Sequence, residues 1–364
     1  MQALFGLAGG ATLTELRVEA EEGPCRVGLE YRHGSSTDVH RSFEVWSYAP
    51  TSPAGVTCEP SESKNIPPLF HAVEQLAGLG VGPIAIHLRL HSHPELLQRY
   101  LDATAPLAPD AAEAVVAKHL FDREVFSPWQ PFIDGLGYRL TGVELFRLEA
   151  VKSPTGAPSH RMPVRVSLIL EPKGPRVARG DRSVAPRTMA SVFAIPFDIS
   201  SMMVELRGDL GACAPTVGVG NGRVQIGGDP EGCTLTEANL AKDLPPLFHA
   251  AFELVGPQAR TTLVMTTQFT VLPVLEKWIP VSDEPPERDY AKLSARMRSA
   301  GIFAHLDPFF AGIGYALDRV SIEKLTSERG AALLKLYPSL ASTGLTAKDR
   351  IPVPLMTTLT LVPR

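Results

Sequence analysis

Pro67-Pro68-Leu69-Phe70-His71-Ala72 occurs a second time in this chain, as Pro245-Pro246-Leu247-Phe248-His249-Ala250. Around this six-residue segment, residues 65–76 and 243–254 are identical at seven of twelve positions. Self-similarity between distant stretches of one chain is the sequence signature of a repeated structural unit. The segment therefore predicts that one ancestral domain was duplicated and fused.

A second pair of similar stretches supports the duplication. Residues 126–143 and 303–320 are identical at eight of eighteen positions, and both contain the pattern Gly-x-Gly-Tyr. Two glycines before an aromatic residue are typical of a helix C-cap that is followed by a tight turn into a strand. The residues concerned are Gly135, Gly137 and Tyr138 in the first copy and Gly312, Gly314 and Tyr315 in the second.

The repeats predict two similar domains, residues 1–172 and 189–364, joined by a basic linker at residues 173–188. We expect each domain to be α+β, with a mainly antiparallel sheet of five or six strands and helices packed on one face. A pseudo-twofold relation between the domains is also expected. The chain has 364 residues, of which 44% are hydrophobic, and this is enough for two domains with separate cores.

The repeated six-residue segment predicts a helix in each copy. Asn65 and Asp243 are favourable N-cap residues, and proline is favoured near the first helical position because its missing N–H has no helical partner there. His71 and His249 fall in the first turns of these helices. Because they are present in both copies, we interpret them, like Tyr138 and Tyr315, as structural repeat positions.

A hairpin is predicted before the helix in each copy. In the second copy, residues 216–220 and 223–227 flank Asn221-Gly222, which supplies the positive φ angles of a type I′ turn. The glycines here are not interpreted as a phosphate-binding loop, since a dinucleotide fingerprint requires glycines between a strand and a helix.

Four polar residues occupy alternate positions along a strand predicted at residues 84–91 and just beyond it: His87, Arg89, His91 and His93. Alternate residues of a strand share one face, and two histidines that are two residues apart can bind one zinc ion. We therefore treat His91 and His93, with His87, as candidate metal ligands, and Arg89 as a candidate partner-binding residue. The alternative is a polar sheet face that carries histidines without a metal.

The tetrapeptide His91-Ser92-His93-Pro94 resembles the His-Ser-His-Pro core of the JAMM/MPN metalloproteases, which remove ubiquitin-like modifiers. This resemblance covers four residues and implies zinc at the two histidines. That family continues with Ser-x-x-Asp, which supplies the third ligand, whereas this chain has Leu101 and Thr104 at those positions. A hydrolytic zinc needs three protein ligands and an open position.

The cysteines also follow the repeat. Cys25 and Cys213 lie before the hairpin, and Cys58 and Cys233 lie between the hairpin and the repeated helix. One disulfide per domain is conceivable, but we expect reduced, buried thiols because disulfides are rare in the cytoplasm. A shared Cys₄ zinc site is not indicated, since there is no Cys-x-x-Cys spacing.

The charge of the chain is nearly balanced, with 35 basic and 39 acidic residues. This argues against a dedicated nucleic-acid-binding protein, which usually has a basic surface. There is no apolar run long enough to span a membrane and no basic region at the start typical of a signal peptide, so we expect a cytoplasmic protein. Arg176, Arg179 and Arg182 of the linker could contact an anionic partner.

These features predict a non-enzymatic binding, scaffold or assembly subunit that self-associates or engages a protein partner. Residues kept in both copies are mostly Pro, Leu, Phe, Gly and Tyr, whereas catalysis needs clustered ionisable groups. A duplicated domain also presents similar surfaces twice, which suits self-association. No cofactor is expected under this hypothesis. The alternative is a metal-dependent hydrolase that uses the His91/His93 face and zinc.

Overall fold

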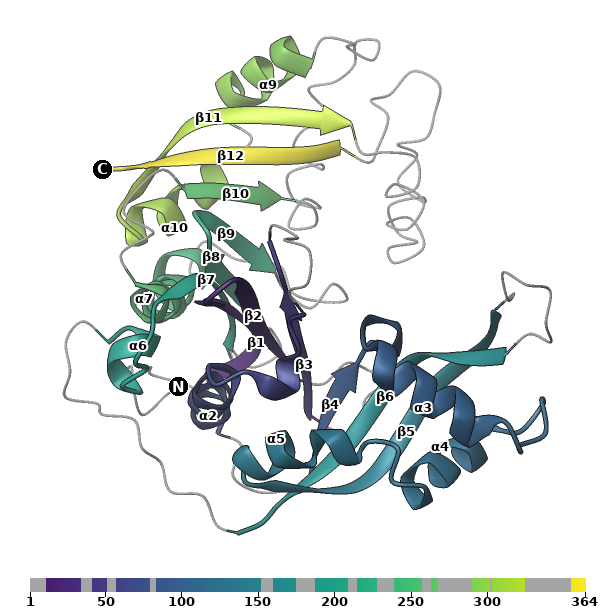
Figure 1. The fold of residues 1–364 in the computed structure, drawn as a ribbon. Helices are drawn as coiled ribbons and strands as arrows, with labels where there is room; N and C mark the ends of the chain where they lie inside the picture. The colour runs from purple at the N-terminus through teal and green to yellow at the C-terminus, as the bar shows by residue number, and fades with distance from the viewer. Residues whose placement is uncertain are drawn as a thin grey trace, which may run out of the picture. The chain divides into compact units, whose positions relative to one another are not determined.

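The computed structural model of the chain shows a mixed α+β protein with a large mixed β-sheet and several helices (Figure 1). The structure describes residues 11–33, 41–50, 57–78, 83–151, 160–174, 187–208, 215–227, 239–256, 263–267, 290–301, 303–324 and 355–364. Within these ranges, no helix is both long enough and apolar enough to cross a membrane.

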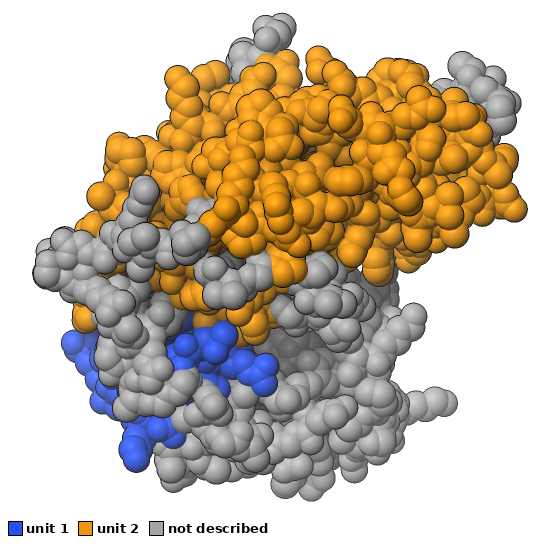
Figure 2. Space-filling model, turned by 90° about the horizontal axis from the view of Figure 1, so that it is seen from below, with its two compact units in different colours: residues 1–12, 203–364 blue, residues 13–202 orange. Residues whose placement is uncertain are grey.

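The chain divides into two compact units, shown in Figure 2. Unit 2 consists of residues 13–202, and unit 1 of residues 1–12 and 203–364. Most of the predicted linker at residues 173–188 lies outside the described residues, and so do its Arg176, Arg179 and Arg182. Residues 325–354, between the last two described strands of unit 1, also lie outside them.

Six described strands belong wholly or almost wholly to unit 2, and we call them the first strand set. They are β1 (Ala11–Glu22), β2 (Cys25–Arg32), β3 (Arg41–Tyr48), β4 (Ile84–Leu88), β5 (Tyr138–Val151) and β6 (His160–Pro172). Their order in the sheet is β1-β2-β3-β4-β6-β5. The β3–β4 pair is parallel, and the other four pairs are antiparallel.

The second strand set belongs wholly or mostly to unit 1. It comprises β7 (Ile199–Gly208), β8 (Thr216–Gly220), β9 (Arg223–Gly227), β10 (Leu263–Thr267), β11 (Tyr315–Lys324) and β12 (Leu355–Pro363). The order is β7-β8-β9-β10-β12-β11, and only the β9–β10 pair is parallel. Both strand sets therefore have the same order and the same pairing directions.

The two sets also share two irregularities. The register of β5 against β6 shifts between Leu140 and Gly142, and that of β11 against β12 shifts between Leu317 and Arg319. In each set the bulge follows the tyrosine of the Gly-x-Gly-Tyr pattern by the same number of residues. Gly137 and Gly314, immediately before those tyrosines, have φ angles of 71° and 80°. The predicted tight turn from helix into strand is therefore confirmed in both copies.

In both units a helix follows the third strand and further helices precede the fifth. Unit 2 contains α2 (Ile66–Leu76), α3 (Pro94–Thr104), α4 (Glu113–Asp122), α5 (Gln130–Gly135) and α6 (Met189–Val192), with short 3₁₀ turns η1 (Pro60–Glu62), η2 (Leu90–Ser92) and η3 (Ser127–Trp129). Unit 1 contains α7 (Leu244–Val255), α9 (Tyr290–Ser299), α10 (Asp307–Gly312), the π-helical turn η4 (Asn239–Asp243) and the 3₁₀ turn η7 (Ala304–Leu306).

The repeated six-residue segment lies in α2 and α7, as predicted. Asn65 and Asp243 occupy the N-cap positions, but neither side chain makes a capping hydrogen bond. In α2 the cap comes from Ser63, whose Oγ accepts a hydrogen bond from the Ile66 amide at 3.1 Å. The predicted capping residues are therefore correct in position, and the predicted side-chain role is wrong.

The core of unit 2 lies between one face of the first strand set and the helices. Phe70 of α2 is fully buried, with its ring centroid 4.6 Å from that of Phe43 on β3 and 5.7 Å from that of Tyr138 on β5. In unit 1, Phe248 of α7 is likewise buried, 6.4 Å from Tyr315 on β11. The repeated segment therefore supplies the central aromatic residue of each core.

Gly312 and Gly135 occupy the same position in the two Gly-x-Gly-Tyr patterns, but they have different surroundings. A Cβ atom on Gly312 would lie 2.6 Å from Cγ of Pro245, whereas a Cβ on Gly135 would meet nothing within 4 Å. We expect Gly312→Ala to lower the free energy of unfolding by about 1–3 kcal/mol, the usual cost of overpacking. Gly135→Ala is the matched control and should be neutral or slightly stabilising. Urea denaturation of both variants tests this, and equal midpoints would contradict it.

Two buried tyrosines predict a loss of stability at alkaline pH. Burial raises the pKa of Tyr31 and that of Tyr100 to about 12, against about 10 in an unfolded chain. The folded protein therefore holds these protons more tightly, so the stabilisation is complete below about pH 10 and is lost as the pH rises toward about 12. Absorbance at 295 nm, recorded with the melting temperature, should show two late-titrating tyrosines. Titration of every tyrosine near pH 10 in the folded protein would contradict this.

Candidate functional site

A row of polar side chains crosses four strands of the first strand set. Glu44 pairs in register with His87, His87 with Ser167, and Ser167 with Glu144. Register partners on neighbouring strands project from the same face of a sheet. The row therefore lies on the face opposite the apolar core, and His87 Nδ1 is hydrogen-bonded to Ser167 Oγ at 2.9 Å.

The second strand set has different chemistry at these positions. Counting from Tyr138 and Tyr315, Ser321 takes the place of Glu144. Ser321 pairs with Thr358, and Thr358 pairs with Thr266. The same fold is thus built with neutral hydroxyl residues in unit 1, so it does not require the ionisable residues of unit 2. Ionisable groups that a fold does not need are candidates for function.

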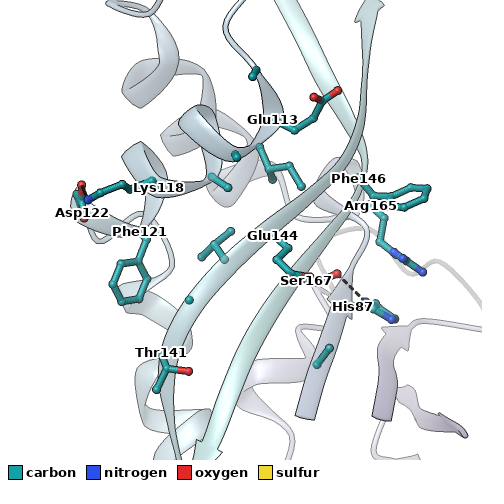
Figure 3. Close-up of a pocket in the computed structure, with 17 residues that line it drawn as sticks. His87, Glu113, Lys118, Phe121, Asp122, Thr141, Glu144, Phe146, Arg165 and Ser167 are labelled. Carbon is teal, nitrogen blue, oxygen red and sulfur yellow. Dashed lines mark hydrogen bonds and ion pairs between the residues drawn. The ribbon is translucent and has the colours of Figure 1, made fainter. Parts of the chain in front are cut away.

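These residues border a groove beside β5 with a volume of about 760 Å³ (Figure 3). One wall is α4, which lies beside β5, and it contributes Ala114, Ala117, Lys118 and Phe121. Figure 3 shows Lys118 and Phe121 on one side of β5, and Glu144, Ser167 and His87 on the other. The groove therefore runs around the outer edge of β5.

Most charged groups that line the groove are already paired. Lys118 Nζ lies 2.6 Å from Asp122 Oδ2, and the guanidinium of Arg165 lies over the Phe146 ring at 4.7 Å. Glu113 accepts a hydrogen bond from the Leu148 amide at 3.4 Å, and backbone hydrogen bonds hold the pKa of its carboxyl below the ordinary value. Among the described residues, Glu144 alone of these acids has no hydrogen-bond or ion-pair partner.

The predicted histidine face is not one continuous strand. β4 ends at Leu88, and Leu90–Ser92 form η2, so Arg89, His91 and His93 do not continue the strand of His87. The chain turns here into α3, whose proline at the first helical position ends the extended stretch. The prediction of a strand through His91 is therefore wrong.

The candidate metal ligands His87 and His93 lie in different surroundings. His87 lies in the groove, and buried His93 has its Nδ1 2.8 Å from Glu59 Oε2, with its ring edge-on to Trp129 at 5.6 Å. The side chain of His91 lies outside the described residues. Arg89 is exposed and lies 2.9 Å from Glu44 Oε1. Within the described residues, no three His, Cys, Asp or Glu side chains lie close enough together to hold a metal ion.

Cys25 and Cys58 form a disulfide, with their Cα atoms 5.8 Å apart. The expectation of reduced thiols is therefore wrong for this pair. Cys25 is the first residue of β2, and Cys58 lies just before η1. The residue after η1, Ser63, also contacts this region, because its Oγ donates a hydrogen bond to Glu22 Oε2 at 2.5 Å. Cys213 and Cys233 lie outside the described residues.

Residues of the two repeated helices make contacts within the fold. In α2, the buried Glu74 accepts a hydrogen bond from the Tyr138 hydroxyl at 2.7 Å, and its other oxygen lies 3.4 Å from His71 Nδ1. In α7, His249 Nε2 lies 3.1 Å from the carbonyl oxygen of Gly312. His249 therefore contacts the turn that leads into β11, whereas His71 is linked to Tyr138 of β5 through Glu74.

Comparison with protein-family models, with curated proteins and with solved structures found no significant match to this chain.

His87 could be selected from the sequence as a candidate, but the other groove residues could not. Glu44, Ser167 and Glu144 come from strands that are far apart in the chain, and only the pairing order brings them into one row. The one local signal was alternation: Glu144 lies between Val143 and Leu145, which are both buried. Alternation predicts a solvent-facing side chain but not its neighbours.

Proposed function

We propose that this protein is a non-enzymatic binding or assembly subunit built from two duplicated domains, and that it engages a protein partner or another copy of itself. The duplication is supported by the identical strand order of the two sets, their identical pairing directions and their matching bulges. The residues of the repeated segments supply core and turn positions, which leaves the surface of each copy able to diverge.

The observation that best supports this proposal is the outer edge of β5. β5 is the last strand of the sheet order, has fourteen residues, and pairs with β6 on one side. A long edge strand presents unpaired N–H and C=O groups that can pair with another chain. Two of the exposed large apolar side chains, Phe146 on β5 and Val115 on α4, lie on the elements that border the groove.

A variant that fills the groove tests the proposal. Ala117→Trp enlarges a side chain of the α4 wall that is only 4% exposed, so the melting temperature of this variant must show that α4 still packs. Val115→Trp is the control on the same helix, since Val115 is 54% exposed and does not line the groove. Light scattering over a range of concentrations measures self-association of the full chain, and quantitative affinity purification measures partner capture. We expect either self-association or partner capture to be lost in Ala117→Trp and kept in Val115→Trp.

The proposal is wrong if folded Ala117→Trp, checked by its melting temperature, self-associates and captures partners as the unmodified chain does. It is equally wrong if the unmodified chain is a strict monomer that captures nothing specific.

The alternative is a metal-dependent hydrolase at His91 and His93, but within the described residues no three His, Cys, Asp or Glu side chains lie close enough together to hold a metal ion. Metal analysis tests that alternative directly. A zinc content near one per chain that falls in a His91→Ala/His93→Ala variant would favour the hydrolase over the binding subunit.

For location, we propose an oxidising compartment in place of the cytoplasm expected from the sequence. The proposal rests on the Cys25–Cys58 bond, because structural disulfides persist in oxidising environments and are rare in the cytosol. Thiol alkylation of the protein in intact host cells, followed by mass spectrometry, tests it. Alkylated Cys25 and Cys58 would overturn the proposal.

A further inference from the structure

The outer edge of β5 is covered at one point and open beyond it. The Leu148 amide donates a hydrogen bond to Glu113 of α4 at 3.4 Å. From Thr141 to Arg147, the β5 backbone has no hydrogen-bond partner outside β6 within the described part of the chain. Residues 141–146 of this stretch line the groove, so the backbone groups without a partner outside β6 lie along it.

An added strand would continue the sheet. Neighbouring strands lie about 4.7–4.9 Å apart in the plane of the sheet, so it would lie beside the outer edge of β5, where the groove runs. The α4 wall of the groove contains the small side chains Ala114 and Ala117 together with Lys118 and Phe121. The volume of about 760 Å³ lies within the range of about 300–1,000 Å³ typical of ligand sites.

The charge of the groove favours a basic occupant. Lys118 is neutralised by Asp122, and Arg165 stacks on Phe146, whereas Glu144 has no partner among the described residues. In a β-sheet, the residue directly opposite another on the next strand has its Cβ about 4.5–5.5 Å away and projects from the same face. A basic residue opposite Glu144 would therefore reach its carboxylate.

The next position on the same face of β5 is Phe146, whose side chain is 48% exposed. Because alternate residues share one face, a residue opposite Phe146 would lie two positions from the basic residue. Aromatic and aliphatic side chains pair favourably across strands. The groove thus fits a pattern of one basic and one apolar residue, separated by a single residue.

We propose that this groove binds an extended segment of a partner protein, which adds a strand to the outer edge of β5. The segment places a basic side chain opposite Glu144 and an apolar one opposite Phe146. This inference rests on the proposed binding function and names the chemistry of its partner. A second copy of the chain is the weaker occupant, because Glu113 blocks the Leu148 end of a long β5–β5 pairing.

A peptide selection tests the inference without knowledge of the natural partner. The probe is a displayed library of random heptapeptides, selected against the full chain and, in parallel, against the Ala117→Trp variant. We expect peptides enriched on the unmodified chain alone to carry Lys or Arg two positions from an apolar residue. No enrichment over the variant, or enrichment without a basic residue, overturns the inference.

The strongest enriched peptide then separates strand addition from general attraction. Methylation of two backbone amides that face β5 should weaken its binding about tenfold or more, since each lost hydrogen bond contributes separately. Glu144→Gln should weaken binding about two- to fivefold, the range of a partly exposed ion pair. The control is Glu149→Gln, which removes an exposed carboxylate of β5 that does not line the groove. Equal binding of the methylated peptide, or equal effects of the two glutamine variants, overturns the inference.

The outcomes also separate this inference from the proposed function. If Ala117→Trp abolishes partner capture or self-association and no peptide is enriched, the binding function stands and the extended-peptide inference fails. If Ala117→Trp changes neither association nor peptide selection, both fail.

Discussion

Removal of the Cys25–Cys58 disulfide is expected to lower the free energy of unfolding of unit 2 by about 3–4 kcal/mol. The two cysteines are separated by 33 positions. Closing a loop of this size restricts the unfolded chain, and the loss of that restriction accounts for the expected effect. The bond also fixes the segment that leads to Glu59, so the contact between Glu59 and the buried His93 depends on it.

Urea denaturation of the unmodified chain and of a Cys25→Ser/Cys58→Ser variant, each with and without reductant, measures this effect. The variant should be less stable by the expected amount. Adding reductant to the variant is the control, since it reports any contribution from Cys213 and Cys233 alone. A difference below about 1 kcal/mol between the unmodified and variant chains, both without reductant, would contradict the prediction, because typical disulfides contribute about 2–4 kcal/mol.

Local features of the fold could be predicted from the sequence because they depend on neighbouring residues. The helices of the repeated segment appear as α2 and α7. The Asn221-Gly222 turn has φ angles of 50° and 68°, as a type I′ turn requires. It joins β8 and β9 at the predicted residues. In these cases one residue decides the local structure, either a glycine that permits a positive φ or a proline that fixes φ.

Non-local features could not be predicted in the same way. The parallel β3–β4 pair depends on a crossover through α2, and the sequence does not state which strands become neighbours. The disulfide was missed because the spacing of Cys25 and Cys58 does not reveal that the chain returns to the start of β2. The strand predicted through His91 failed because alternation continues beyond Leu88, where the backbone has already turned into η2.

The differences between the two units explain why the groove could not be predicted from the repeats. The residues that the repeated segments share are mostly core and turn residues. The groove depends instead on positions where the two units differ, such as Glu144 in unit 2 and Ser321 in unit 1. The shared residues therefore do not reveal the residues that distinguish one unit from the other.

The largest single-residue effects are expected for Phe70→Ala and Phe248→Ala. Each substitution should lower the free energy of unfolding by about 3–5 kcal/mol. Both side chains are fully buried, at 0% and 1% exposure. Removing either leaves a cavity among other aromatic rings. Phe70 lies 4.6 Å from Phe43, and Phe248 lies 5.4 Å from Phe252, measured between ring centroids. Because the two residues occupy the same position in the repeated segment, duplication predicts comparable costs in the two units.

Denaturation of both variants, monitored by circular dichroism, measures these costs. Val115→Ala is the control, because it shortens an apolar side chain that is 54% exposed, and its effect should stay within about 0.5 kcal/mol. Each phenylalanine variant should destabilise the unit that contains it. A cost near that of the control for either phenylalanine would mean that its ring does not fill a core. The repeated segment would then have different roles in the two copies, and the duplication would lose its main physical support.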